Sequence, residues 1–399
     1  MSRLCCFFNY NPLYRLPIYR AMDQSMACDF YFGDSVFEPL KQFPPEELKG
    51  FRRMFHTVKT GFKDYKWHQG IGCLFHGYDD YLITGQIDYL ANWLVIIYAK
   101  LRGKHVYCWT HGISRSEISK PISRRIYRTF FKSMDGIFMY NRFKFTIMRE
   151  LGIDEKKMHV IHNSLDTRKQ TELYQQLTDS DIYRSHFGND CPTIIYIGRI
   201  QARKKLDLLI EALSIINGKD HQANLVIVGA PTDDNSIQEI VDQKNLQNAV
   251  WFYGPCFDEA TNAELLYNAA VCVCPAAVGL TAIHALTYGT PVVSNDNLEE
   301  QMPEFEAIRN GVTGSFYKSG DVNSLVEEIL RWTKKSPAER SQIRYVARTD
   351  IEREWSVDYQ MRVFLDVFSQ HAINQNKCRY ESIMVDRSTP ARDNGKNPE

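Results

Sequence analysis

Strand and helix signals alternate along most of the chain, and this alternation constrains the fold more than any other feature. From residue 193 onward, the short apolar runs TIIYIGRI, NLVIVGA, VWFYG, VCVCP and PVVSN are separated by helical patterns. Alternating strands and helices favour parallel sheets that are covered by helices. The second half of the chain is therefore predicted to be a doubly wound α/β domain.

The first half of the sequence shows the same alternation. The apolar runs RLCCFF, YLIT, HVYCWTHG, GIFMY and MHVIHNS are separated by helical patterns over 89–101, 121–133 and 142–151. A chain of 399 residues suits two domains of ordinary size. The expected parts are an N-terminal domain 1–165 completed by an amphipathic helix at about 355–370, a linker 166–190, a C-terminal domain 191–354, and a disordered tail 371–399.

Composition and charge argue against several classes of protein. The formal net charge is +0, which gives no general attraction to nucleic acid. The 10 cysteines lack the paired spacing of a metal finger, and the N-terminus does not read as a secretion signal. Both features favour the cytoplasm. Residues 89–101 fall short of the roughly 20 apolar residues that span a membrane, and are predicted to form a helix buried against a sheet.

Residues 120–132, KPISRRIYRTFFK, combine basic and apolar residues in one predicted helix. Such a helix can lie peripherally on the inner membrane surface, with its apolar side inserted among the lipids. It can also bury that side in the protein and leave its charges in water. The sequence leaves both interpretations open.

Basic residues follow the predicted strand that ends at Gly198. Arg199, Arg203, Lys204 and Lys205 crowd the turn before the next helix. Ligands of open α/β sheets bind at the carboxyl ends of strands, and a glycine lets them approach the backbone. Cations at this place suit a phosphate group, although a solvated basic turn would have the same composition.

A second strand end, in CPAAVGLTAIHALTYGTPVVSN at 274–295, shows a complementary pattern. A helix is predicted to begin near Leu280, so the amides of Val278, Gly279, Leu280 and Thr281 lack acceptors within the helix. Such a helix start binds anions. Two loops of this kind at one sheet edge predict a site for a diphosphate.

In order and spacing, IGRIQARKKLDLLIEAL, LVIVGA, VWFYG, AELLYNAAVCVCPA and VGLTAIHALTYGTPVVSN resemble the donor domain of glycosyltransferase family 4. NPLYRLPIYRAM, WTHG and HNSLD are similar to elements of this family's first domain. The resemblance implies the GT-B fold, which has two Rossmann-like doubly wound domains facing a cleft. WTHG with VGLTAIHALTYGTP is similar to a subgroup found in bacterial capsule and lipopolysaccharide gene sets.

The resemblance also implies an activity. Members transfer a sugar from a nucleotide-diphosphate sugar to an acceptor hydroxyl, with retention of configuration and with neither a metal nor another cofactor. In pathways of this kind the acceptor is a growing, often lipid-linked oligosaccharide at the cytoplasmic face of the membrane. Two other classes remain open, namely a nucleotide-sugar epimerase of the same architecture and a catalytically silent subunit that binds sugar nucleotides.

Residue by residue, the family's diphosphate-binding cations match Arg199 and Lys204, and its donor-sugar histidine matches His111. The amide-donating loop of the family matches the helix start described above. The family's two glutamates correspond here to Ala276 and His284. We expect His284 to hydrogen-bond the nucleotide ribose in place of a carboxylate. A histidine packed against the neighbouring strand is the alternative.

Three candidates lie in the first half of the chain. His111 ends an apolar strand and is followed by Gly112, so it is expected at the edge of the first sheet. Tyr14 and Arg15 follow the first predicted strand and could contact the donor phosphate or the acceptor. A structural role is the alternative for each of these residues.

Overall fold

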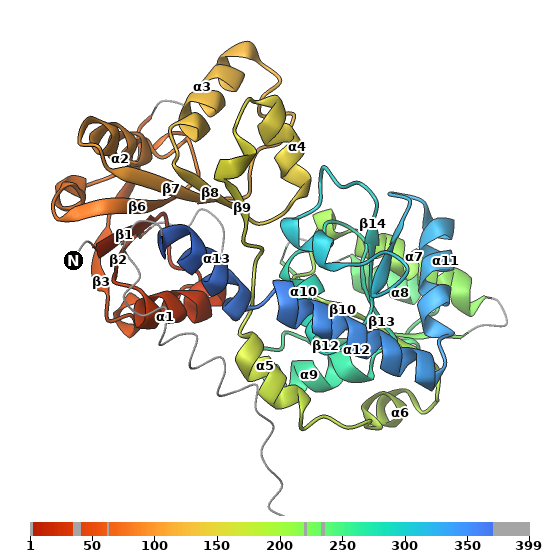
Figure 1. Ribbon diagram of the computed structural model, residues 1–399. Helices are drawn as coiled ribbons and strands as arrows, with labels where there is room; N and C mark the ends of the chain where they lie inside the picture. The colour runs from red at the N-terminus through yellow and green to blue at the C-terminus, as the bar shows by residue number, and fades with distance from the viewer. Residues whose placement is uncertain (1–2, 35–40, 62–63, 219–221, 233–235, 370–399) are drawn as a thin grey trace, which may run out of the picture. The chain divides into compact units, whose positions relative to one another are not determined.

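The computed structural model (Figure 1) describes residues 3–34, 41–61, 64–218, 222–232 and 236–369. The chain divides into two compact units. The first unit lies within 1–139, 145–159 and 361–399, and the second within 140–144 and 160–360. The chain changes unit inside α4 (Phe143–Glu150) and inside α13 (Val357–Ser369). The expected tail 371–399 lies outside the described residues.

Among the described residues, the first unit has a seven-stranded sheet in the order β3-β2-β1-β6-β7-β8-β9. The five pairings from β3 to β8 in this order are parallel. A separate antiparallel pair joins β4 (Thr57–Lys59) to β5 (Lys66–His68). The strands of the large sheet are β1 (Arg3–Phe8), β2 (Cys28–Gly33), β3 (Phe51–Phe55), β6 (Tyr78–Thr84), β7 (His105–Thr110), β8 (Gly136–Met139) and β9 (Met158–Val160).

Helices cover both faces of this sheet. The helices α2 (Leu90–Leu101) and α3 (Pro121–Lys132) share one apolar core with alternate residues of the strands. On the other face, Phe8 stacks on Tyr19 of α1 (Leu16–Ser25), with ring centroids 5.1 Å apart. Trp109 meets Phe364 of α13 at 5.2 Å. The last helix of the described chain therefore packs on the first unit.

The surroundings of α2 differ from the prediction. One side of this helix is buried, at Ala91, Asn92, Val95, Ile96 and Ala99, but the opposite side carries exposed leucine and isoleucine residues. The prediction of a helix that is buried against a sheet is therefore correct for one face only. In α3, Phe130 and Phe131 are buried, whereas its basic residues face solvent.

The second unit has a six-stranded sheet among the described residues, in the order β12-β11-β10-β13-β14-β15. All five neighbouring pairs are parallel. The strands are β10 (Thr193–Ile197), β11 (Asn224–Val228), β12 (Val250–Gly254), β13 (Val271–Cys274), β14 (Val292–Asn295) and β15 (Gly314–Tyr317). The helices are α5 (Thr167–Tyr174), α6 (Ile182–Phe187), α7 (Leu206–Asn217), α8 (Ile237–Gln243), α9 (Glu259–Asn268), α10 (Leu280–Thr287), α11 (Val322–Thr333) and α12 (Pro337–Glu354).

The two faces of this sheet bury two separate cores. Ile194 packs with α7, α8 and α11, whereas its neighbour Ile195 packs with α9, α10 and α12. Successive residues of a strand point to opposite faces, so strands buried on both sides must be apolar throughout. The stretch 166–190 differs from the expected linker, because Tyr183 and its neighbours pack into the second of these cores.

Both sheets have a point where the strand order reverses. In the second unit, β10 is followed along the chain by β11 and β12 on one side, and β13 begins the other side. The loops after β10 and β13 therefore diverge and leave a crevice at the carboxyl edge, where open α/β sheets bind ligands. The sequence prediction of doubly wound α/β units is confirmed.

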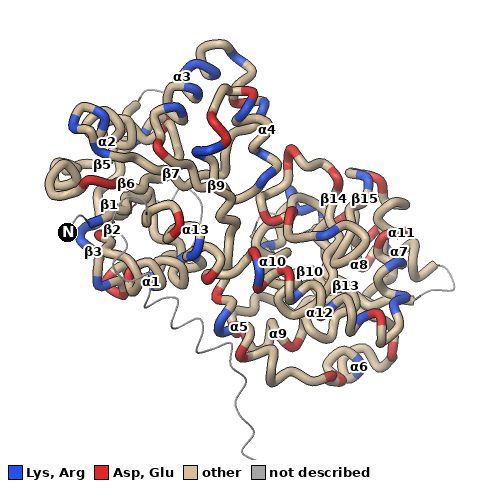
Figure 2. The backbone as a smooth tube through the Cα atoms, in the orientation of Figure 1, with Lys and Arg blue, Asp and Glu red and all other residues tan. Residues whose placement is uncertain are grey.

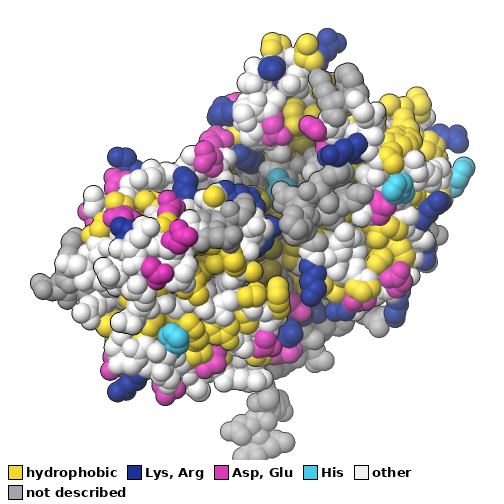
Figure 3. Space-filling view, turned by 180° about the vertical axis from the view of Figure 1, so that it is seen from behind, with side chains coloured by type: hydrophobic (Ala, Val, Ile, Leu, Met, Phe, Trp, Pro, Cys, Tyr) yellow, Lys and Arg dark blue, Asp and Glu magenta, His cyan; other side chains and the backbone are white. Residues whose placement is uncertain are grey.

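Charged side chains of both signs are interspersed along the backbone and over the surface (Figures 2 and 3). This distribution agrees with a formal net charge of +0. No helix in the described ranges has the length and apolar character needed to cross a bilayer.

Candidate functional site

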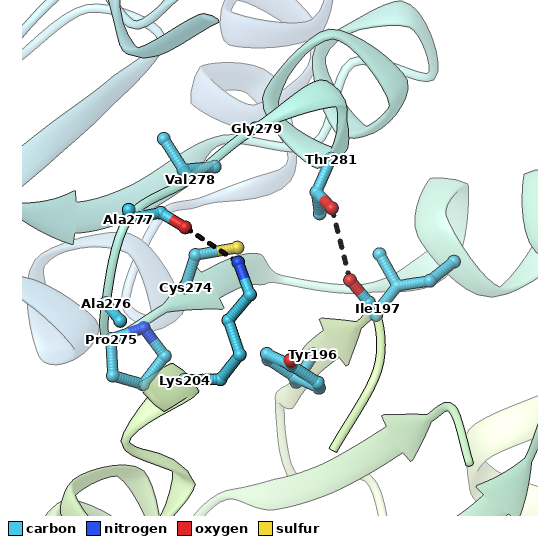
Figure 4. Close-up of a pocket in the computed structure, with 11 residues that line it drawn as sticks. Tyr196, Ile197, Lys204, Cys274, Pro275, Ala276, Ala277, Val278, Gly279 and Thr281 are labelled. Atoms are coloured by element: carbon cyan, nitrogen blue, oxygen red, sulfur yellow. Dashed lines mark hydrogen bonds between the residues drawn. The ribbon is translucent and has the colours of Figure 1, made fainter. Parts of the chain in front are cut away.

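A pocket that is open to solvent lies at the carboxyl ends of β10 and β13 (Figure 4). Residues 196–198, Lys204, residues 274–279 and Thr281 line it. The walls therefore come from the end of β10 with its following turn, and from the loop between β13 and α10. This is the point of strand reversal in the second sheet.

Lys204 supplies a positive charge to the pocket. It ends a short 3-10 helix, Ala202–Lys204, and its Nζ donates a hydrogen bond to the carbonyl of Ala277 at 3.0 Å. Figure 4 shows the side chain reaching across from the β10 side to the opposite wall. Burial lowers the pKa of Lys204, and the nearby Arg203 and Arg199 act in the same direction. The ammonium group is thus only partly solvated and gains from an anionic ligand.

Buried polar side chains hold the β13–α10 loop in place. Ser294 Oγ donates to the carbonyl of Ala276 at 3.0 Å, and Gln301 Nε2 donates to Ser294 Oγ at 3.0 Å. The amide of Val278 donates to Gln301 Oε1 at 2.8 Å. Ser294 and Gln301 are both buried, and their hydrogen bonds are therefore protected from water. The loop is thus held in one conformation before a ligand arrives.

The start of α10 offers amides to the pocket, with one correction to the prediction. Gly279 is the N-cap and provides no side-chain cap, so the first-turn amides of Leu280 and Thr281 lack acceptors within the helix. Thr281 Oγ1 is turned toward β10, where it donates to the carbonyl of Ile197 at 3.2 Å. The amide of Val278 was expected to face a ligand, but Gln301 accepts its hydrogen bond.

Gly198 takes the chain out of β10 with φ +151 and lies against β11. Its amide donates to the carbonyl of Val228 at 2.9 Å. A Cβ added to Gly229 would lie 1.9 Å from the carbonyl oxygen of Gly198. The two strand ends therefore approach so closely that position 229 has no room for a side chain.

The structure brings most of the predicted residues of the second unit together. Those that line the pocket are Gly198, Lys204, Val278, Gly279 and Thr281. Arg199 lies two residues after the end of β10 and is half-buried. It does not line the pocket, and neither do Leu280 and His284.

His284 lies one turn further along α10 and is paired with a carboxylate that the sequence analysis did not identify. Its Nε2 lies 3.0 Å from Oε1 of Glu259, at the first turn of α9. The same oxygen accepts a hydrogen bond from Tyr288 at 2.7 Å and from Gln170 at 2.9 Å. A carboxylate only accepts, so Nε2 of His284 carries a hydrogen and donates it to Glu259.

The comparison with protein families identifies this part of the chain. Residues 178–350 match the family described as Glycosyl transferases group 1. The match includes every residue that lines the pocket. This stretch of the chain is therefore similar to a group 1 glycosyl transferase domain.

Relatives of the chain include proteins from capsule gene regions. An uncharacterized 41.2 kDa protein in the cps region of Klebsiella pneumoniae is 23% identical over 58% of this chain and 63% of its own length. The capsular polysaccharide biosynthesis glycosyltransferase CapM of Staphylococcus aureus is 25% identical over 48% of this chain and 47% of its own. Mannosylfructose-phosphate synthase of Agrobacterium fabrum is 27% identical over 37% of this chain and 34% of its own length. The matches thus span about a third to two thirds of these relatives.

Solved structures share the fold over nearly the whole chain. HepE of Anabaena in complex with UDP aligns with a TM-score of 0.69 and 15% identity, over 92% of this chain and 100% of its own. The lipopolysaccharide outer core galactosyltransferase WaaB aligns with a TM-score of 0.65 and 16% identity, over 92% of this chain and 99% of its own. At such identities the likeness shows the fold, which is GT-B with two Rossmann-like domains. The expected fold class is confirmed.

Glu259 lies within the stretch that matches this family, and sequence reasoning missed it. It is the first residue of α9, the helix that follows β12, and this helix-start position is the signal that could have identified it. Burial would raise its pKa, but hydrogen bonds and charge from His284, with hydrogen bonds from Tyr288 and Gln170, lower the pKa to about 2. The side chain is therefore an anion at neutral pH.

Glu259→Gln is expected to lower the free energy of unfolding by about 1–3 kcal/mol at pH 7. The folded-state pKa of about 2 lies below the ordinary 4.5. The ionised carboxylate therefore stabilises the fold above pH 4.5, and this contribution is lost as the pH falls from 4.5 toward 2. Urea unfolding at stepwise lower pH measures the difference, with the exposed Glu172→Gln as the control. A difference that stays constant on acidification would contradict this account.

The first-unit candidates occupy different surroundings within that unit. His111 is exposed directly after β7. Arg15 is buried, where it donates to Tyr19 Oη at 3.3 Å and lies 4.8 Å from the ring of Trp109. Tyr14 is half-buried in the same 3-10 helix, Leu13–Arg15. The contacts of Arg15 are those of a residue that fastens α1 to the sheet.

Within the described ranges of the chain, no group of three or more His, Cys, Asp or Glu side chains is arranged to hold a metal ion. Among the described residues that line the pocket there is no aspartate or glutamate. The groups of this pocket that suit an anionic ligand are the ammonium group of Lys204 and backbone amides.

Proposed function

We propose that the protein is a glycosyltransferase that moves a sugar from a nucleotide-diphosphate sugar to a hydroxyl of an oligosaccharide acceptor. The observation that carries the proposal is the meeting of Lys204 with the open first turn of α10 in one pocket, at the reversal point of the sheet. Both groups attract a diphosphate. The family match and the capsule-region relatives support surface polysaccharide synthesis as the pathway.

In the proposed reaction, Lys204 neutralises the charge that grows on the departing diphosphate. The amides at the start of α10 assist, and because the loop is already held by Ser294 and Gln301, little reorganisation is needed. Arg199, one residue beyond the pocket lining, is proposed to add a second cation. No metal or other cofactor is required in this scheme, so we expect EDTA to leave turnover unchanged.

We propose that the anomeric configuration of the sugar is retained. The acceptor hydroxyl then attacks the face from which the diphosphate leaves, and a phosphate oxygen of the leaving group takes its proton. This scheme needs no protein carboxylate as nucleophile. It is supported by Ala276, which lines the pocket where the family has a glutamate. Proton NMR of the product made from an α-linked donor tests it, because an initial β-linked product would exclude retention.

The acceptor is proposed to be lipid-linked, with the enzyme at the cytoplasmic face of the membrane. Two alternatives predict different products. An epimerase releases an altered nucleotide sugar without any acceptor. A silent subunit binds the donor without turnover. Of these two alternatives, the silent subunit is favoured by the presence of Ala276 and His284 where the family has two glutamates. A panel of nucleotide sugars, incubated with and without lipid-linked oligosaccharide, separates the three. Nucleotide release that depends on the acceptor supports the transferase. An altered nucleotide sugar formed without acceptor would indicate the epimerase, and no conversion at all would indicate the silent subunit; either result contradicts the proposal.

His111→Ala is expected to raise the free energy of the transition state by about 1–3 kcal/mol, measured from kcat/KM. The reason is the proposed hydrogen bond between the exposed imidazole and the donor sugar. Affinity for the nucleoside diphosphate alone should not change, because that ligand lacks the sugar. His76→Ala, at another exposed histidine of the first unit, is the control. Loss of cooperative melting in His111→Ala would instead indicate a structural residue.

His284→Ala is expected to weaken binding of uridine diphosphate about fivefold to tenfold. We propose that His284, held by Glu259 through Nε2, presents its remaining ring atoms to the ribose. Glu259→Gln should shift the affinity in the same direction, because a neutral amide oxygen holds the ring by a weaker hydrogen bond than a carboxylate does. Calorimetric titration with uridine diphosphate measures this change in affinity. Equal affinity in wild type and His284→Ala would show that the histidine does not contact the nucleotide.

A further inference from the structure

The outward face of α2 is apolar along the whole helix. Leu90, Leu94, Ile97 and Leu101 are 36%, 40%, 51% and 81% exposed. At 100° per residue, these four positions fall within an arc of about 60°. A surface helix ordinarily places polar residues on that side. Four exposed aliphatic side chains in one stripe therefore mark an interaction surface rather than scattered apolar residues.

α3 lies beside α2 on the same face of the sheet. Trp93 of α2 and Phe130 of α3 meet edge to face, with ring centroids 5.1 Å apart. The buried sides of both helices belong to one apolar core. Since both helices cover the same face, their outer sides look away from the sheet in the same general direction.

The outer side of α3 adds positive charge to the stripe. Arg125, Arg128 and Lys132 are exposed there, and Ile122 is 77% exposed among them. Neither α2 nor α3 contains an aspartate or glutamate. Figure 2 shows several Lys and Arg positions along α3 and no acidic one. Aliphatic side chains and cations are thus combined on one surface.

We propose that the outer sides of α2 and α3, the α2–α3 surface, dock on an anionic lipid bilayer. The aliphatic stripe enters the boundary between headgroups and acyl chains, and the arginines contact the headgroups. A second copy of this chain fits less well. A two-fold interface sets the same patch against itself, which would bring the cations of two α3 helices together.

The α2–α3 surface deepens the proposed function, since a lipid-linked acceptor has to be reached at a membrane. It does not depend on that proposal experimentally, because vesicle binding is measured without donor or acceptor. An inactive protein that binds vesicles would leave this inference standing, and an active protein that does not bind would overturn it alone.

Flotation of the full chain with vesicles tests the proposal. Wild type should bind vesicles of phosphatidylglycerol and phosphatidylcholine, and more weakly those of phosphatidylcholine alone. Leu94→Ser/Ile97→Ser/Leu101→Ser should bind at least tenfold more weakly. Arg125→Gln/Arg128→Gln should lose about 25-fold on the anionic vesicles, at roughly fivefold for each charge.

Matched controls come from the second unit. Tyr345→Ser removes an apolar residue that is 68% exposed, and Arg331→Gln/Lys334→Gln removes two exposed cations. Both controls should bind as wild type does, and all variants should melt as wild type does because the altered side chains are exposed. The proposal is overturned if wild type does not bind anionic vesicles or if the triple variant binds equally well. Sedimentation that shows a wild-type dimer dissociated by the triple variant would assign the face to a second copy instead.

Discussion

Replacing Lys204 by alanine is expected to lower turnover about 10²- to 10³-fold, which corresponds to the loss of one preorganised charge partner of a leaving group. The ammonium group lies in the pocket, held 3.0 Å from the carbonyl of Ala277, and burial together with Arg203 and Arg199 lowers its pKa. An anionic leaving group would offset the energetic cost of holding this partly buried ammonium group in its charged form. Arg199→Ala should act in the same direction.

Steady-state kinetics with the true donor and acceptor measure this effect, and thermal melting shows whether the fold is kept. Lys334→Ala, which removes an exposed lysine from the same unit, is the matched control and should keep full turnover. If Lys204→Ala and Arg199→Ala both turn over at the wild-type rate, the pocket at the ends of β10 and β13 is not where the diphosphate departs.

Gly229→Ala is expected to destabilise the second unit by roughly 2–4 kcal/mol and to abolish donor binding. Its new Cβ would lie 1.9 Å from the carbonyl oxygen of Gly198, and both colliding groups are attached to the backbone, so no side-chain rotation relieves the clash. The ends of β10 and β11 must separate, which breaks the bond from the Gly198 amide to Val228 and displaces the pocket wall.

Calorimetric melting should show a decrease of about 5–15 °C for Gly229→Ala. Gly72→Ala is the matched control, because a Cβ at that glycine meets no heavy atom within 4 Å. Its melting temperature should stay near that of wild type. A Gly229→Ala protein with wild-type stability and nucleotide affinity would show that the close approach of β10 and β11 is not needed.

The sequence was sufficient for the strands β10 to β14 of the second unit and for the helices between them, but not for β15 or α12. Strands buried on both faces must be apolar throughout, and the helices between them begin and end at local signals such as Gly279 and Gly289. Local signals also predicted the turn that carries Lys204 and the start of α10. The two were expected to lie together, because parallel strands place their carboxyl ends at one edge of the sheet. The family likeness then assigned roles, which stay predictions for Arg199, His111 and His284.

The strands β2 and β3 were not predicted, because a charged residue in β2 is stabilised by residues that lie far from it in the sequence. Asp29 interrupts the apolar pattern of β2, and its carboxylate is buried. Arg3 of β1 and Arg52 of β3 lie 2.6 Å and 2.8 Å from the carboxylate. A buried charge is tolerated only with such partners, and they come from neighbouring strands that the local sequence does not reveal.

The sequence itself determined the strands β10 to β14, the helices between them and the two loops of the pocket, because periodicity and turn residues act between near neighbours in the chain. Tertiary structure alone decided that Glu259 receives hydrogen bonds from α5 and α10, and that Gln301 takes the amide of Val278. It alone decided which side of α2 stays exposed. Those outcomes depend on which distant groups meet, and a nearly all-apolar helix such as α2 carries no pattern that distinguishes its buried side from its open one.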